Sequence, residues 1–317
     1  MHSDFQKLPF FHNLDTGVDD GFVQFFQSAS NTLPLGYIAA DGCTALEQVV
    51  RNIQTLRRLT SCDSVPIYVP RFTKLSRPPS LERFFGENGL NNFNLPASHN
   101  GTYEIEKLTF LEPFRWLETG PCTNLARMLQ TNSGDIKQNL RQIVIMGGVF
   151  EGPGIVGSID PKTNAPCAEF NFYHDAEAVD TVLYIAERLG VEVVIVSWDQ
   201  CRLLKFLRSE IFEFRAKSPG SGRILDITRA FFSLYPKGDF SDELSEPGYV
   251  PADSIAWAAF QGEFGTLESV HMHIETNTQS TFYGQTRLTE GGHPIKRYVL
   301  KDVEGLKAYI LDLMGWF

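Results

Sequence analysis

The order of apolar and polar positions along the chain predicts short buried strands that alternate with amphipathic helices. Gln142–Met146 and Val191–Ser197 are nearly continuous apolar runs, as expected for strands covered on both faces. Between these runs, Ala176–Leu189 repeats its apolar residues with the period of a helix. A strand, a helix and a strand at this spacing predict a βαβ unit with a right-handed crossover.

The same pattern continues on both sides of this unit. Strands are expected at Leu8–Phe11, Leu35–Ala40, Val65–Val69, Phe110–Leu117 and Val270–Ile274. Helices are expected at Asp19–Ser30, Thr44–Thr60, Thr123–Leu129, Ile224–Tyr235, Ser254–Phe260 and Val303–Leu313. The length of 317 residues suits one large domain or two modest ones, and no linker separates two. We therefore expect a single α/β domain over residues 1–317, with a Rossmann-like, open and mostly parallel sheet flanked by helices.

Three stretches interrupt the pattern, and loops of this length inside a compact domain usually serve a function. They are rich in Pro, Gly, Asn or Asp and lie at Arg71–Gly101, Glu151–Pro166 and Pro236–Pro251. Thr276–Thr286 resembles a polar strand or hairpin without assigned chemistry.

Composition narrows the range of partners. The net charge is −10, so a basic surface for nucleic acid is not expected. The five cysteines are scattered and form no C-x-x-C pair, which favours reduced thiols over a zinc or redox motif. Because no apolar run suits a signal peptide or a membrane span, we expect a cytoplasmic protein without membrane contact.

An acidic cluster follows the first expected strand and opens the first expected helix. Asp15, Asp19 and Asp20 lie within six residues, and Gly17 permits a sharp turn between them. Close carboxylates repel one another unless a cation lies between them, and hard oxygen ligands suit Ca²⁺. The alternative is a plain helix N-terminus, where Asp19 and Asp20 complement the helix dipole.

Other polar segments follow strands or begin helices, which is the edge where open α/β sheets bind ligands. They are Trp116–Ala126, Ile143–Gly148, Ala168–Asn171, Asp175–Ala178, Ser197–Asp199 and Ala252–Ala256. The order D-T-G-V-D-D, T-G-P-C-T-N-L-A, V-I-M-G-G and A-E-F-N resembles the inosine-uridine preferring nucleoside hydrolase family, from Asn13 to the last helix. The loop between Gly148 and Ala168 is more similar to the purine-preferring branch.

This resemblance implies Ca²⁺-dependent hydrolysis of a ribonucleoside, with a purine base favoured, by a homodimer or homotetramer. Carboxylates near the sugar would stabilise the positive charge that develops as the N-glycosidic bond breaks. The implied ligands of Ca²⁺ are Asp15, Asp20, the backbone carbonyl of Thr119 and Asp253, completed by two ribose hydroxyls and a water. Asp15 would be the general base for that water.

The resemblance also implies contacts to the sugar. Asp19, Asn171 and Asp253 would hold ribose hydroxyls, Glu169 would hold the 5′-hydroxyl, and Met146 would pack beneath the ring. Aromatic side chains could stack on the base, and the candidates are Phe84, Phe85, Phe231, Phe232 and Tyr235, of which Tyr235 is favoured.

Four departures from the family pattern concern the site. The family usually has Asp where this chain has Asn13, and Asn where it has Cys43, although Asp41 is close enough to substitute. An expected Asn is missing from Gly152–Ile155, and Ala252 stands where relatives have His or Trp. Two alternatives therefore stay open: a ribosyl-binding homologue with little turnover, or a hydrolase of an unusual N-ribosyl compound.

Three further residues are weighed between roles. His12 either supports the acidic cluster from behind or is simply structural. Asp199 could orient a helix start or line the pocket, and the structural role is favoured. His174 is expected to lie in a loop.

Overall fold

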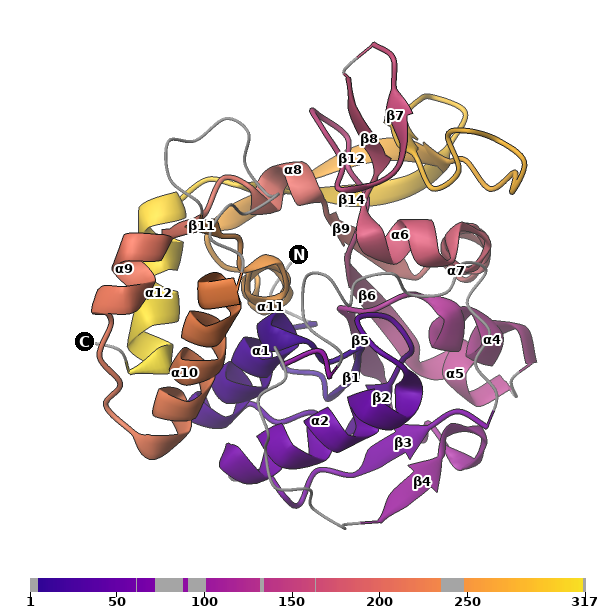
Figure 1. Ribbon diagram of the computed structural model, residues 1–317. Helices are drawn as coiled ribbons and strands as arrows, with labels where there is room; N and C mark the ends of the chain where they lie inside the picture. The colour runs from indigo at the N-terminus through magenta and orange to yellow at the C-terminus, as the bar shows by residue number, and fades with distance from the viewer. Residues whose placement is uncertain are drawn as a thin grey trace.

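The computed structural model describes residues 5–60, 62–71, 88–90, 101–131, 134–162, 164–234 and 248–315. Ten strands in this part of the chain form one sheet, in the order β13-β12-β14-β9-β6-β5-β1-β2-β3-β4 (Figure 1). The strands are β1 (Phe10–Leu14), β2 (Gly36–Ala39), β3 (Ile67–Val69), β4 (Thr102–Glu104), β5 (Phe114–Glu118), β6 (Leu140–Met146), β9 (Glu192–Val196), β12 (Gly265–Ile274), β13 (Thr286–Leu288) and β14 (His293–Leu300).

From β4 across to β14, every neighbouring pair of strands is parallel, whereas β12 runs antiparallel to both β14 and β13. The sheet is therefore open and mostly parallel, as the sequence predicts. The βαβ unit predicted around Ala176–Leu189 is confirmed, because β6 and β9 are parallel neighbours joined through that helix.

The strand order reverses beside β1. The chain leaves β1 toward β2, β3 and β4 on one side, and later returns to β5 and β6 on the other. The carboxyl ends of β1 and β5 therefore border a topological switch point, which is where open α/β sheets form ligand sites. Asn13 and Glu118 are direct partners in the register of these two strands.

Helices cover both faces of the sheet. One face carries α1 (Val18–Ala29), α2 (Leu46–Leu59), α11 (Ala252–Gln261) and α12 (Val303–Met314), and α10 (Pro219–Leu234) packs on α1 (Figure 1). The other face carries α4 (Thr123–Thr131) and α7 (Ala176–Leu189). Because both faces are covered, Val144 and Ile145 at the centre of β6 are buried in opposite apolar cores.

Local sequence signals set the ends of α7. The Asp175 side chain accepts a hydrogen bond from the backbone N–H of Ala178 at 3.1 Å, which caps the N-terminus. Gly190 ends the helix at a φ of +68°, a left-handed conformation that favours glycine.

Two predictions from the apolar and polar pattern were wrong or incomplete. Glu151–Pro166 was expected to be irregular, yet it contains β7 (Val156–Asp160) and the start of β8 (Ala165–Ala168), an antiparallel pair. The side chains of β7 are half-buried or exposed and lack the apolar alternation that marks a half-buried strand. The long strand β14 was not predicted, and Thr276–Thr286 is mostly the turn between β12 and β13.

The short elements β10 (Phe206–Leu207), β11 (Gly248–Tyr249), α5 (Gly134–Asn139), α6 (Phe170–His174), α8 (Trp198–Cys201), α9 (Arg208–Glu213) and the 3₁₀ turn η1 (Ile105–Lys107) complete the described structure. None of the helices seen in the described ranges is long and apolar enough to cross a membrane.

Candidate active site

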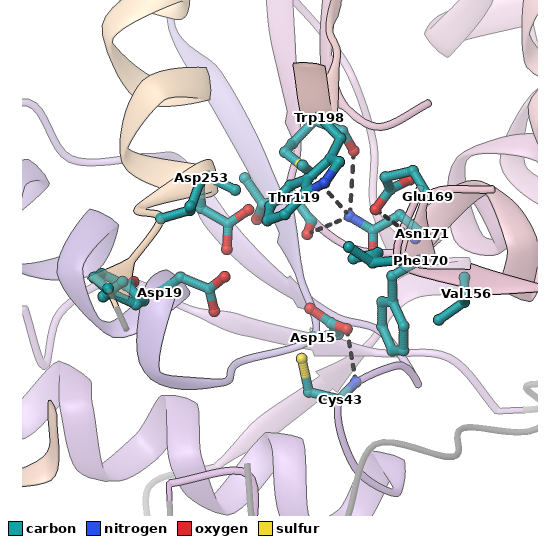
Figure 2. A pocket seen from close by; sticks show the side chains of 16 residues that line it. Asp15, Asp19, Cys43, Thr119, Val156, Glu169, Phe170, Asn171, Trp198 and Asp253 are labelled. Atoms are coloured by element: carbon teal, nitrogen blue, oxygen red, sulfur yellow. Dashed lines mark hydrogen bonds between the residues drawn. The ribbon is translucent and has the colours of Figure 1, made fainter. Parts of the chain in front are cut away.

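A pocket opens at the carboxyl edge of the sheet, beside the switch point (Figure 2). Its lining comes from strand ends and from the residues that follow them, as the strand-end rule predicts. Seven of the residues expected at the site line it: Asp15, Asp19, Thr119, Met146, Glu169, Asn171 and Asp253. Asp20 does not line the pocket and lies behind it.

Four aspartates interact electrostatically beside the pocket. They are Asp15, just after β1, Asp19 and Asp20 of α1, and Asp253 at the start of α11. Burial, followed by repulsion from Asp19, raises the pKa of Asp15 to about 7. Burial also raises the pKa of Asp19 to about 6, and it raises the pKa values of Asp20 and Asp253 well above their usual range. The cluster therefore opposes the accumulation of negative charge unless a cation joins it.

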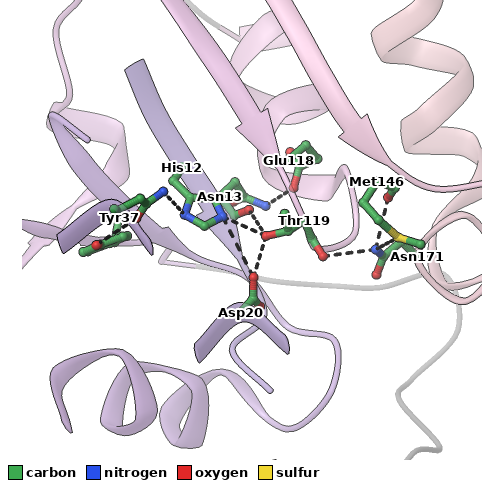
Figure 3. Close-up of polar contacts among 9 residues, drawn as sticks. His12, Asn13, Asp20, Tyr37, Glu118, Thr119, Met146 and Asn171 are labelled. Carbon is green, nitrogen blue, oxygen red and sulfur yellow. Dashed lines mark hydrogen bonds and ion pairs between the residues drawn. The ribbon is translucent and has the colours of Figure 1, made fainter. Parts of the chain in front are cut away.

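A polar network fixes Asp20 from behind (Figure 3). The Thr119 hydroxyl donates to Asp20 Oδ1 at 2.6 Å, and His12 Nε2 lies 2.8 Å from the same hydroxyl. Gln27 and Tyr37 continue the chain of hydrogen bonds beyond His12. Burial lowers the pKa of His12 to about 3, so the ring is neutral at ordinary pH. His12 thus supports the acidic cluster from behind.

A second network lies beneath Thr119 and involves Glu118, which is fully buried. Asn13 Nδ2 donates to Glu118 Oε1, and Trp116 Nε1 donates to Glu118 Oε2 at 2.9 Å. Asn124 Nδ2 in turn donates to Asn13 Oδ1 at 2.9 Å. The side chain at position 13 is an amide where the family usually has a carboxylate, and a buried carboxylate faces it from the neighbouring strand.

Glu169 and Asn171 hold the opposite wall of the pocket. The Glu169 carboxylate accepts hydrogen bonds from the backbone N–H groups of Gly148, Asn171 and Phe172, at 3.0, 2.8 and 3.1 Å. Asn171 Nδ2 donates to the backbone carbonyls of Thr119 and Met146 at 3.1 and 3.2 Å. One amide therefore ties together the carboxyl ends of β5 and β6.

The chemistry of the acidic cluster suits a hard cation. Its donors are carboxylate and carbonyl oxygens, and Asp20 Oδ2 is buried without a hydrogen-bond partner. However, no three His, Cys, Asp or Glu side chains in the described ranges are placed to hold a metal ion together. Asp15 Oδ2 accepts instead from the backbone N–H of Cys43 at 2.7 Å (Figure 2). The donor types fit a cation, although the side chains are not arranged around one.

The remainder of the pocket is largely apolar, and the sequence did not identify its residues as contacts. Trp198 follows β9, so its position at a strand end was a usable signal. Tyr249 is placed by the pairing of β11 with β10, and Phe170 by α6. Ile155 and Val156 enter from the loop after β6, and no periodic pattern marked these positions.

The structure places several other residues that the sequence had singled out around the site. Cys43 lines the pocket, whereas Asp41 accepts a hydrogen bond from the backbone N–H of Leu46 at the start of α2, so Asp41 does not take the place of the expected Asn. His174 was expected in a loop, but it is buried in α6 with Nδ1 2.7 Å from the Phe170 carbonyl. Asp199 has the expected structural role, because it accepts from the backbone N–H of Phe150 at 2.8 Å. The aromatic candidates Phe84, Phe85 and Tyr235, and the side chains of Phe231 and Phe232, lie outside the described residues.

Comparison with known proteins identifies the family. Residues 10–308 match the model of the inosine-uridine preferring nucleoside hydrolases. The chain is 28% identical over 271 residues to the pyrimidine-specific ribonucleoside hydrolase RihA of Salmonella enteritidis, a match that covers 82% of each chain. Its fold is similar to that of a plant nucleoside hydrolase, with a TM-score of 0.79, 17% identity and coverage of 97% of this chain and 99% of the other.

A purine-preferring ribonucleoside hydrolase from Gardnerella vaginalis is also similar, with a TM-score of 0.75 and 22% identity. That match covers 97% of this chain and 98% of the other chain. The fold, the acidic pocket at the switch point and these comparisons agree, and the chain therefore belongs to the inosine-uridine preferring nucleoside hydrolase family, whose members are N-glycosyl hydrolases.

Proposed function

We propose that this nucleoside hydrolase cleaves a purine ribonucleoside into free base and ribose with the help of one Ca²⁺ ion. The observation that carries the metal part is the group of four aspartates, in which Asp20 Oδ2 is buried without a partner. Asp15, Asp20, Asp253 and the Thr119 carbonyl would hold the ion. The ion would supply positive charge that orients the sugar hydroxyls and a water molecule.

The chain's own residues would supply the remaining chemistry. Asp15 would take the proton of the attacking water, since its pKa of about 7 is near the pH at which a general base works well. Asp19, Asp253, Glu169 and Asn171 would hold the ribose hydroxyls, with Met146 beneath the ring. The carboxylates would also stabilise positive charge on the sugar as the bond to the base breaks.

The base preference rests on the apolar half of the pocket. The flat ring of Trp198 and the side chains of Phe170 and Ile155 offer an extended apolar surface for a two-ring base. Similarity to a purine-preferring hydrolase supports this choice, while the curated relatives named RihA are pyrimidine-specific. Both kinds of base therefore belong in the test.

A second substrate class follows from the leaving-group side of the pocket. Ala252 provides no proton donor, and no His, Lys or Arg side chain is among the described residues that line the cavity. An N-ribosyl compound whose leaving group departs without protonation would suit such a pocket. This observation favours a substrate outside the common nucleosides as the alternative.

The test is ribose release from purine and pyrimidine nucleosides, and from p-nitrophenyl riboside, with Ca²⁺ or with a chelator. We expect Ca²⁺-dependent turnover of the purine nucleosides, and we expect Asp15→Asn to lower it by about 10²–10⁴-fold, as for loss of a general base. p-Nitrophenyl riboside is an O-riboside whose leaving group departs without protonation, so its turnover alone would favour the second class. Turnover that is equal with Ca²⁺ and chelator would refute the metal assignment.

A further inference from the structure

Glu118 has an unusual environment for a buried acid. It is the last residue of β5, its side chain is fully buried, and it faces Asn13 of β1 across the sheet. Among the described residues, only donors approach its carboxyl oxygens: Asn13 Nδ2, Trp116 Nε1 and the backbone N–H of Gly120. This pattern matches the needs of a carboxylate, which accepts hydrogen bonds and donates none.

No ion pair compensates this carboxylate. Within the described residues, Glu118 forms no salt bridge with any Lys, Arg or His side chain. A buried carboxyl group resists ionisation unless an opposite charge is near, and burial raises the pKa of Glu118 well above its usual range. The nearest place for an opposite charge is the aspartate cluster, because Glu118 immediately precedes Thr119 and interacts electrostatically with Asp15.

Hydrogen bonds also link Glu118 to the strand ends that carry the aspartate cluster. The Asn13 side chain is held between Glu118 and Asn124, and Asn124 Nδ2 also donates to the Ala39 carbonyl at 2.9 Å. The backbone carbonyl of Asn13 accepts from the N–H of Thr119 at 3.0 Å. The ends of β1, β2 and β5 are thus joined next to Asp15 and Thr119.

We infer that Glu118 is a positioning residue of the cation site: through Asn13 it holds the strand ends that carry Asp15 and Thr119. This inference rests on the metal site proposed above. It assigns a role in cation affinity to a residue that touches neither the substrate nor the ion.

The hydrogen bond from Asn13 to Glu118 has a fixed donor and a fixed acceptor, so exchanging the two side chains tests the inference. In Glu118→Gln, the amide introduced at position 118 has a single oxygen for two donors, Asn13 Nδ2 and Trp116 Nε1. In Asn13→Asp, two carboxyl groups face each other. The double variant exchanges the two groups. The carboxylate introduced at position 13 accepts from Asn124 and from the amide introduced at position 118, whose oxygen accepts from Trp116. The hydrogen bonds are then restored.

The measurement is Ca²⁺ affinity by calorimetry on chelator-treated protein, together with the unfolding midpoint of the same protein without Ca²⁺. We expect Glu118→Gln to weaken Ca²⁺ binding by about 10- to 100-fold, as when a group behind a metal ligand is removed. We expect the double variant to bind Ca²⁺ more tightly than either single variant. A purely structural role would lower the metal-free midpoint and leave the affinity unchanged.

The matched control is Glu192→Gln. Glu192 accepts from Gln142 Nε2 at 2.7 Å across β9 and β6, so it is another amide–carboxylate pair between neighbouring strands, at the opposite edge of the sheet. Its removal should leave Ca²⁺ affinity at the wild-type value. If wild-type protein binds Ca²⁺ but Glu118→Gln binds it equally well, or if the double variant is no better than the singles, the inference about Glu118 fails alone. Absence of Ca²⁺ binding in the wild type would overturn the metal site as well.

Discussion

The position of the Asp15 carboxylate depends on the absence of a side chain at Gly42. A Cβ atom added to Gly42 would lie 1.9 Å from Asp15 Oδ2 and 2.5 Å from Asp15 Cγ. Asp15 is buried and its Oδ2 is held by the backbone of Cys43, so the clash cannot be relieved by a small rotation into solvent. The loop after β2 therefore shapes the catalytic end of the pocket through its backbone.

We expect Gly42→Ala to lower kcat/KM by about 100-fold, the order of loss caused by a misplacement of about 1 Å at a reacting group. Steady-state kinetics on the best substrate measures this effect, and near-ultraviolet circular dichroism checks that the fold persists. Gly101→Ala is the matched control, because an added Cβ there meets nothing within 4 Å. Equal activity of the two variants would show that Asp15 tolerates displacement or is not the base.

For individual residues, the sequence predicted part of the pocket lining. Asp15, Asp253 and Glu169 follow strands or begin helices, and the strand-end rule brings such residues together whatever their separation along the chain. Tyr249 and Val156 could not be predicted in the same way, because their places depend on two-stranded pairings in irregular stretches. Ca²⁺ ligation itself remains a prediction.

Among the elements, the loop after β6 is held by an ion-pair network rather than by apolar packing alone. Arg297 of β14 contacts Asp199 at 2.9 Å and Glu151 at 2.8 Å. Asp199 also accepts from the backbone N–H of Phe150. The loop continues to Ile155 and Val156 in the pocket wall, so β14 helps to shape the pocket from a distance.

The two carboxylates that share Arg297 should contribute very differently to stability. The Asp199 side chain is 7% exposed and that of Glu151 is 69% exposed. Asp199→Ala leaves a largely buried guanidinium without its buried partner, and we expect it to lower the free energy of unfolding by roughly 3 kcal/mol. Glu151→Ala removes a solvated partner and should cost less than about 1 kcal/mol. Urea denaturation of both variants compares them, and similar losses would contradict this account.

The strands that the apolar pattern predicted and the strand that it missed differ in how far their side chains are exposed to solvent. β6 and β9 are buried on both faces, so their apolar runs were easy to recognise. β14 places Lys296 and Arg297 inside a strand, and those charges concealed it. Arg297 is tolerated there because its charge is paired at the carboxyl edge.

For the whole molecule, the acidic pocket predicts a pH dependence of stability that Ca²⁺ should reverse. The pKa values of Asp15, Asp19 and Glu169 are raised to about 7, 6 and 7, from ordinary values of 3.8, 3.8 and 4.5. As pH rises between these ordinary and raised values, the unfolded chain has already lost its protons while the folded chain still holds them. The stability of the metal-free protein therefore falls as pH rises from about 4 to about 7.

Calorimetric midpoints with chelator and with saturating Ca²⁺ test this between about pH 5 and pH 8. The difference between the two midpoints should grow with pH, because the ion compensates the charges that appear. Other titrations, such as those of His12 and His174, occur in both samples and largely cancel in the difference. A difference that does not change with pH would mean that these acids do not face the ion.

The Asn171 amide is hydrogen-bonded to two backbone carbonyls, and this limits which ligand groups the pocket can recognise. Its Nδ2 is used by two backbone carbonyls, so only its Oδ1 remains to face a ligand. The Glu169 carboxylate likewise offers only lone pairs, as do Asp19 and Asp253 when ionised. This polar wall accepts hydrogen bonds and provides almost none in return. A sugar bound there would be selected by the hydrogens it brings, and each missing hydroxyl would leave a buried oxygen unsatisfied at a cost of about 1–3 kcal/mol, so we expect the wall to distinguish ribose from its deoxy and fluoro counterparts.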